Sequence, residues 1–440
     1  MNESYAVLYE IFTSIRKERN IFFKNDDKFL KVIEYWIKIF YLTYYSMHEK
    51  KLTVLDLDVE TAKRSILRTT FTNNNKSTNP NTKRINKYLP ILLFFSKYFR
   101  PKVGILPGGL SHSFLDKLKY ILLFIKVKSA KVSIDKEFKI LFLKKVEIIF
   151  GENLYYDLLV ALIPNIFFVN KLNNNNFFPS KLKGSPNSFL DNNYNYIKLL
   201  LTDDNISITG IQHGGSYGEW IDNPFEEFDL SISDKFYGWG LLTNNISQNR
   251  FKKLSNKINS EIFWIGRGRL QLESTEMVSF DSYDKHLNDV SHIEAFAKYF
   301  QNYNIVFLEH PRDADPVYKN IFNCGIERSS SAETLITNSK LVIFDCLSNT
   351  SMYYCIYYYI PFIILLNKFP LDGLTENALR FYHTLSRNNL LITLDDCLNY
   401  NSKLDFIKSY LDDNQNHFFS KEVIEYFESH FKSKITIKDI

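Results

Sequence analysis

The stretch that decides the fold is Ile206-Ser207-Ile208-Thr209-Gly210-Ile211-Gln212-His213-Gly214-Gly215. Its first six residues are rich in β-branched side chains, which predicts a strand that ends at the turn containing the two adjacent glycines. Further short apolar runs follow at 262–265, 305–308, 341–344 and 362–366, and helical stretches such as 350–359 separate several of them. Buried strands that alternate with helices predict parallel sheets, in which ligands bind at the carboxyl ends of the strands.

The length of 440 residues favours two domains of about 200 residues each. We place the first domain at 1–245, the second at 246–400 and a C-terminal helical segment at 401–440, because the polar stretch 243–260 lacks apolar periodicity. Within the first domain, apolar residues recur at helical spacing over 29–47 and predict an amphipathic helix. Apolar residues make up 45% of the chain and charged residues 23%, as in a folded globular protein.

Charge and cysteine content narrow the class of protein. The net charge of +5 is spread along the chain, which argues against a nucleic-acid partner. The four cysteines form no Cys-x-x-Cys pair, so we expect reduced thiols in the cytoplasm and neither a zinc site nor a disulfide framework. No secretory signal pattern is present, and the longest apolar runs, 158–169 and 352–366, are shorter than the ~18–20 residues that span a bilayer.

One basic segment departs from this mild charge balance. Over 117–147, nine lysines face three acidic residues. Such a segment suits either the anionic head groups of a membrane surface or an ordinary solvated helix face. We therefore expect a cytoplasmic protein, with peripheral contact at the cytoplasmic face of the inner membrane as an extension of that prediction.

The first chemical motif is the turn from Gln212 to Gly218, which carries three glycines in five positions. Glycines let the backbone approach a ligand closely, and His213 at the strand end can act as an acid, a base or a hydrogen-bond donor near neutral pH. The plain alternative is a tight turn with a satisfied histidine.

Two later motifs also follow predicted strands. In Glu309-His310-Pro311-Arg312, the proline fixes the turn and the arginine offers a cation suited to phosphate oxygens, although a proline-terminated strand with solvated charges has the same sequence. In Ser348-Asn349-Thr350-Ser351, hydroxyl groups and free amides precede a helix that we expect to begin near Thr350, and such groups bind anions. The plain alternative is an N-cap. Arg267, in Gly-Arg-Gly-Arg, is a weaker candidate for the same role.

Several common catalytic patterns are absent from the sequence: the P-loop, the dinucleotide-binding Gly-x-Gly-x-x-Gly after a first strand, the Gly-x-Ser-x-Gly elbow and His-Glu-x-x-His. These absences remove the usual support for P-loop, dehydrogenase, α/β-hydrolase and zinc-protease chemistry. Transferase chemistry is the class that best survives.

The run from Gly210 to Gly240, with Gln-His-Gly-Gly-x-Tyr-Gly and then Ile232-Ser233-Asp234-Lys235-Phe236-Tyr237-Gly238-Trp239, resembles the transferases of bacterial surface-carbohydrate (capsule and O-antigen) loci. The early Glu34-Tyr35-Trp36 also fits that family. The resemblance is tight over 184–240 and loose over most of the chain. More distantly, a Gln-His-Gly turn with a later His-Pro and a Ser/Thr-rich loop is similar to Kdo, sialyl and pseudaminyl transferases and to CDP-glycerol glycerophosphotransferases.

The resemblance implies an α/β fold of the GT-B type, in which two Rossmann-like domains with parallel sheets face each other across a cleft. The first domain would take the acceptor and the second the nucleotide sugar. Where the relatives often have paired Ser or Thr, this chain has Ser348-Asn349-Thr350-Ser351, so the sequence leaves open which hydroxyl meets the phosphate. The predicted nucleotide-binding residues are Arg267, His310, Pro311, Arg312, Ser348, Asn349, Thr350 and Ser351.

The implied activity is transfer of an acidic ulosonic or nonulosonic sugar (Kdo, pseudaminic or sialic type) from its CMP donor to a surface polysaccharide or its lipid-linked precursor. The donor is a substrate, and no cofactor or metal is expected. His213, Glu219 and Asp222 are the predicted catalytic residues, since one of them could assist the acceptor hydroxyl. Predicted substrate-binding residues are Gln212, Gly214, Gly215 and Tyr217.

Three alternatives stay open at the level of the sequence. The same fold could use CDP-glycerol, CDP-ribitol or a UDP-sugar as its donor. It could also epimerise a nucleotide sugar without an acceptor, or bind glycans without catalysis. Nucleotide binding separates the last of these from the others.

Overall fold

The computed structural model describes residues 3–49, 103–106, 114–151, 156, 159–160, 163–173, 178–186, 196–202, 205–212, 214–242, 260–265, 294, 296–308, 326–327, 332–366, 373–393, 402–413 and 418–431. The chain divides into two compact units. Unit 1 contains the described residues up to Gln212 and the segment Pro224–Phe236, whereas unit 2 contains Gly214–Asn223 and the described residues from Tyr237 onward. None of the described helices is long and apolar enough to cross a membrane.

Unit 1 is built on a four-stranded sheet in the order β1-β4-β5-β6. The pairs β1–β4 and β4–β5 are parallel. Its strands are β1 (Val103–Ile105), β4 (Lys181–Gly184), β5 (Ser207–Ile211) and β6 (Lys235–Tyr237). A separate antiparallel pair joins β2 (Lys131–Ile134) to β3 (Val169–Asn173). The strand predicted from the opening stretch is therefore present as β5.

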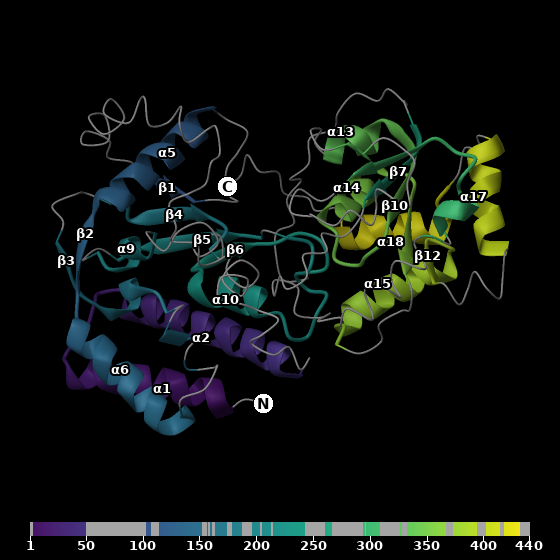
Figure 1. Ribbon diagram of the computed structural model, residues 1–440. Coiled ribbons are helices and arrows are strands. Elements are labelled where there is room, and N and C mark those ends of the chain that lie inside the picture. The colour runs from purple at the N-terminus through teal and green to yellow at the C-terminus, as the bar shows by residue number, and fades with distance from the viewer. Residues whose placement is uncertain are drawn as a thin grey trace. The chain divides into compact units, whose positions relative to one another are not determined.

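Helices cover the four-stranded sheet of unit 1. Figure 1 shows α5 on one side of it and α10 and α2 on the other, with α1 and α6 farther out beside α2. Their bounds are α1 (Glu3–Glu18), α2 (Asp26–Glu49), α5 (Phe114–Ser129), α6 (Lys136–Phe150), α9 (Ile197–Leu200) and α10 (Pro224–Ile232), with a short 3₁₀ helix at Asn165–Phe168. The helix predicted over 29–47 lies inside α2.

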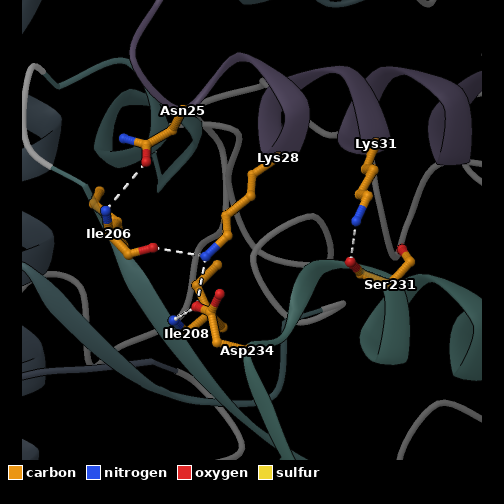
Figure 2. A network of polar contacts seen from close by, with 7 residues as sticks. All are labelled: Asn25, Lys28, Lys31, Ile206, Ile208, Ser231 and Asp234. Atoms are coloured by element: carbon orange, nitrogen blue, oxygen red, sulfur yellow. Dashed lines mark hydrogen bonds and ion pairs between the residues drawn. The ribbon is translucent and has the colours of Figure 1, made fainter.

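Lysines of α2 tie this helix to the sheet and to the segment after α10. The Lys28 ammonium donates to the Ile206 carbonyl at 2.7 Å and to the Asp234 carboxylate at 2.6 Å (Figure 2). The same carboxylate accepts the Ile208 backbone N–H at 2.6 Å, which fixes the start of β5. Figure 2 also shows the contacts of Asn25 with Ile206 and of Lys31 with Ser231.

Unit 2 is built on a six-stranded sheet in the order β12-β11-β10-β7-β8-β9, and every neighbouring pair is parallel. The strands are β7 (Ser260–Ile265), β8 (Ile305–Leu308), β9 (Ile326–Glu327), β10 (Ser339–Phe344), β11 (Phe362–Leu366) and β12 (Leu391–Thr393). All five residues of β11 are buried. Continuous apolar burial is typical of a parallel strand covered on both faces.

The helices of unit 2 pack against this sheet. Those described over their whole length are α13 (Ala332–Thr337), α14 (Thr350–Tyr358), α15 (Glu376–Arg387), α17 (Ser402–Asp413) and α18 (Lys421–Phe431). Phe362 of β11 is in ring contact with Phe419 and Phe427, so the segment that contains α18 joins the core of the sheet. The mixed α/β class with parallel sheets is thereby confirmed. The domain limits predicted at 245 and 400 stay predictions.

Candidate functional site

The strand order of unit 2 points to one edge of its sheet. When β7 to β12 are renumbered 1 to 6 in chain order, the strands lie in the order 6-5-4-1-2-3. Read in reverse, this is 3-2-1-4-5-6, the order of a Rossmann sheet. The order reverses between β7 and β10, which are direct neighbours. In open parallel sheets, ligands bind outside the carboxyl ends of the strands at this reversal. The residues that follow β10, from Asp345 to the start of α14, therefore form the candidate site.

Ser348 has an unusual backbone conformation in this loop. Its φ is +61°, in the left-handed region that residues other than glycine rarely adopt. Its hydroxyl donates a hydrogen bond to the Glu219 carboxylate and accepts one from Trp220 Nε1 at 2.9 Å. Its backbone N–H points to the Tyr382 hydroxyl at 3.4 Å. Such strained conformations persist where surrounding contacts hold them and are concentrated at functional sites.

Helix α14 begins directly after this residue. The Asn349 side chain accepts the Ser351 backbone N–H at 2.9 Å, so the amide of Asn349 acts as the N-cap. The start predicted near Thr350 is confirmed. The hydroxyls of Thr350 and Ser351 are half-buried and form no hydrogen bond with the residues that the structure describes. These two hydroxyls are available to a ligand.

The glycine turn packs directly on the Ser348 loop. A Cβ atom on Gly215 would lie 2.6 Å from the Ser348 carbonyl oxygen and 3.0 Å from the Thr350 backbone nitrogen. Gly218 has a φ of +74°, and a Cβ there would lie 2.6 Å from the backbone of Leu241. A Cβ on Gly214 would meet nothing within 4 Å. Two of the three glycines are therefore required by the fold of unit 2.

Backbone hydrogen bonds fasten the residues after these glycines to the segment before α15. The Thr375 hydroxyl donates to the Gly218 carbonyl at 2.6 Å, and the Thr375 N–H donates to the Glu219 carbonyl at 2.8 Å. Trp220 and Leu374 form an isolated antiparallel bridge. These bonds explain why Gly214–Asn223 belongs to unit 2, although the strand that precedes it, β5, belongs to unit 1.

Glu219 lies at the centre of this arrangement with no solvent exposure. Besides the Ser348 hydroxyl, its carboxylate accepts the hydroxyl of Tyr353 at 2.8 Å. Burial raises the pKa of Tyr353 and of Tyr382, and the nearby charge of Glu219 raises each further. Both tyrosines are thus held in the neutral form, in which they can donate a hydrogen bond.

The other predicted site residues have varied surroundings. Gln212 is fully buried at the end of β5 in unit 1, Tyr217 is buried in unit 2, and Asp222 is exposed. Five predicted residues lie outside the described part of the chain: His213, Arg267, His310, Pro311 and Arg312. Among described side chains, no group of three or more His, Cys, Asp or Glu residues is placed to hold a metal ion.

Sequence reasoning missed four residues that support the site. Tyr353 lies in α14 and Tyr382 on the buried face of α15, where an aromatic residue is ordinarily part of the core. Trp220 and Thr375 stand outside the predicted motifs, although Thr375 does carry the signal of an N-cap one residue before α15. Trp220, Tyr353 and Thr375 each bond a residue that is more than 120 positions away in the chain.

Comparison with known proteins gives the class of the chain. No curated protein matches it. The model of the LIC12162 family transferases matches residues 9–393, a span that contains both sheets, the glycine turn and the Ser348 loop. The chain therefore belongs to the LIC12162 family and is a transferase.

Proposed function

We propose that this transferase is a GT-B glycosyltransferase that takes an acidic ulosonic or nonulosonic sugar from its CMP donor. The acceptor would be a bacterial surface polysaccharide or its lipid-linked precursor. The observation that carries the proposal is the Ser348 loop, because it joins a strand to a helix at the reversal of a Rossmann-ordered sheet. The CMP-linked donor is inferred from the resemblance of the sequence to CMP-using transferases.

The leaving group determines what the loop must do. When the bond between the anomeric carbon and the phosphate oxygen breaks, CMP departs with an additional negative charge. The amides and partial positive charge at the start of α14, with the hydroxyls of Thr350 and Ser351, are suited to that charge. Arg267 follows β7 by two residues and His310 follows β8 by two, and Arg312 would add a second cation. The proposal therefore requires neither a metal ion nor a cofactor.

The acceptor hydroxyl must lose its proton as it attacks the anomeric carbon. His213 is the proposed base, and Asp222, an exposed carboxylate nine residues later in the sequence, is the alternative. Gln212, Gly214, Gly215 and Tyr217 are the proposed residues around the transferred sugar and acceptor. The part assigned to Glu219 is treated separately below, because its carboxylate is buried.

A lipid-linked acceptor would place the enzyme at the cytoplasmic face of the inner membrane. Helix α6 supports this proposal: its stripe of Phe138, Phe142 and Val146 is buried, whereas Ile148 is 82% and Ile140 53% exposed. The exposed Lys136 and Lys144 lie on the same helix. Exposed apolar side chains on a helix that also exposes lysines suit an anionic lipid surface. No nucleic-acid partner is proposed.

A thermal-shift series with CMP, CDP, UDP and GDP tests the donor. We expect saturable stabilisation by CMP, because a ligand that binds only the folded protein raises its melting temperature. Stabilisation by CDP or UDP with none by CMP would transfer the proposal to a CDP-glycerol, CDP-ribitol or UDP-sugar donor. Conversion of a nucleotide sugar without any acceptor would indicate an epimerase instead. If none of the four nucleotides stabilises the protein, both the CMP-linked donor and the CDP- or UDP-linked donors are refuted.

A further inference from the structure

The buried carboxylate of Glu219 is the least ordinary group in unit 2. Removing a carboxylate from water is costly unless hydrogen bonds replace its hydration. Here one oxygen accepts the Tyr353 hydroxyl and the other accepts the Ser348 hydroxyl. Both of these partners are neutral hydroxyls. Ser348 and Tyr353 thus form a polar cage around the Glu219 carboxylate inside an apolar core.

Complete burial makes Glu219 a poor catalytic base. A general base must reach the proton that it removes, either directly or through one water. The carboxylate of Glu219 has no exposed surface, and both of its oxygens already accept hydroxyl protons. Its contacts serve the Ser348 loop instead.

The same contacts commit the Ser348 hydroxyl. A serine hydroxyl has one proton, and Ser348 donates it to Glu219. The oxygen also accepts from Trp220 Nε1, so the side chain is anchored from two directions. Thr350 and Ser351, in contrast, form no side-chain hydrogen bonds with described residues.

We propose that Glu219 is a positioning residue: it holds the Ser348 hydroxyl and the left-handed backbone at Ser348, so that Thr350 and Ser351 present their hydroxyls to the ligand. The phosphate identity of that ligand rests on the proposed function, whereas the anchoring of the loop does not. Ser348 is then an anchor of the loop rather than a nucleotide ligand. Of the hydroxyls among which the sequence leaves the choice open, the proposal assigns the ligand to those of Thr350 and Ser351 at the start of α14.

The test compares Glu219→Gln with Glu219→Ala by amide hydrogen exchange of the peptides covering 344–353. Glutamine has the same shape, and its carbonyl and amide groups can bond the same hydroxyls, whereas alanine leaves them unpaired in the core. We expect exchange to rise about tenfold or more in Glu219→Ala and to stay within about threefold of wild type in Glu219→Gln. Glu376→Ala is the matched control, because that carboxylate is 85% exposed on α15 of the same unit.

CMP titration then separates anchors from ligands. Thr350→Val should weaken CMP binding about tenfold with wild-type exchange, because it removes a hydroxyl without disturbing the cage. Ser348→Ala should raise exchange in 344–353, and any loss of CMP affinity should accompany that rise. Weaker CMP binding by Ser348→Ala with unchanged exchange would make Ser348 a ligand and overturn the proposal.

The remaining outcomes are also decisive. Wild-type exchange in Glu219→Ala, or equal damage in Glu219→Gln and Glu219→Ala, would refute the positioning role. If Glu219→Ala does not fold, Glu219→Gln and Ser348→Ala decide: the role requires near-wild-type exchange in the first and raised exchange in the second. If wild type binds none of the four nucleotides, the proposed function fails, and the exchange comparison still decides what Glu219 does.

Discussion

Replacing Gly215 by alanine offers the sharpest test of the contact between the glycine turn and the Ser348 loop. The new Cβ would lie 2.6 Å from the Ser348 carbonyl oxygen, about 0.8 Å short of ordinary van der Waals contact. Its three nearest neighbours, in Ser348, Asn349 and Thr350, are all backbone atoms, which cannot rotate away as a side chain can. The turn and the loop must therefore separate. Because Glu219 follows Gly215 by four residues and bonds Ser348, separation also stretches that hydrogen bond.

Overpacking of this kind costs about 1–3 kcal/mol. For a unit of roughly 200 residues, this corresponds to a fall in melting temperature of about 2–12 °C. Displacement of binding groups by close to 1 Å typically costs about tenfold to hundredfold in function, so we expect CMP affinity to fall by a similar factor. Differential scanning calorimetry and isothermal titration with CMP measure the two effects.

Gly214→Ala is the matched control one residue away. Its Cβ would meet nothing within 4 Å, so the free energy of unfolding should change by no more than about 0.5 kcal/mol. Equal effects of the two substitutions on melting temperature would refute the packing argument. A stable Gly215→Ala protein with wild-type CMP affinity would show that the turn does not position the loop.

Three further predictions concern other parts of the chain. Gly218→Ala combines a clash with a φ of +74° and should cost about 2–4 kcal/mol in urea denaturation; a cost below that of Gly215→Ala would contradict this reasoning. Burial would raise the pKa of Asp234, but hydrogen bonds from Lys28 and the backbone outweigh it and the pKa lies below the ordinary 3.8. The stability that Asp234 contributes is therefore present above about pH 4 and lost below it, and Asp234→Asn should reduce this acid-induced loss measured by urea denaturation at each pH. Ile148→Asp on α6 should weaken sedimentation with phosphatidylglycerol vesicles about tenfold while Leu230→Asp on α10 does not, and equal binding to uncharged vesicles would exclude recognition of anionic lipid.

Much of the fold is visible in the sequence because parallel strands are buried on both faces. Such strands appear as continuous apolar runs, and the runs predicted at 305–308 and 362–366 coincide with β8 and β11. The start of α14 was predictable for a different reason, since polar residues cluster where a helix leaves its first amides unpaired. The strand order was not predictable, because pairing of β7 with β10 depends on contacts across about 80 residues.

The candidate site, like the fold, is only partly predictable from the sequence. Glycines and small polar residues after strands point to a site, so both the turn and the Ser348 loop could be found from local pattern alone. The contact between the turn and the Ser348 loop could not be predicted from local pattern. The turn follows a strand of unit 1, whereas its own hydrogen bonds fasten it within unit 2. Sequence proximity to His213 suggested a shared catalytic role for Glu219, whereas its contacts connect it to residues 129 and 134 positions away.

A carboxylate near a glycine turn has two physical meanings that sequence cannot separate. In water it can accept a proton from a substrate; in a core its oxygens must be filled by donors from the protein itself. Glu219 belongs to the second kind, since it is buried and Ser348 and Tyr353 each donate to one of its oxygens. The glycine at 215 gains its meaning from this arrangement, because only a residue without a Cβ lets the turn come close enough for Glu219 to reach the loop. The glycines and the glutamate thus act together: the former allow the approach, and the latter uses it to hold Ser348 in a conformation that the serine would not adopt alone.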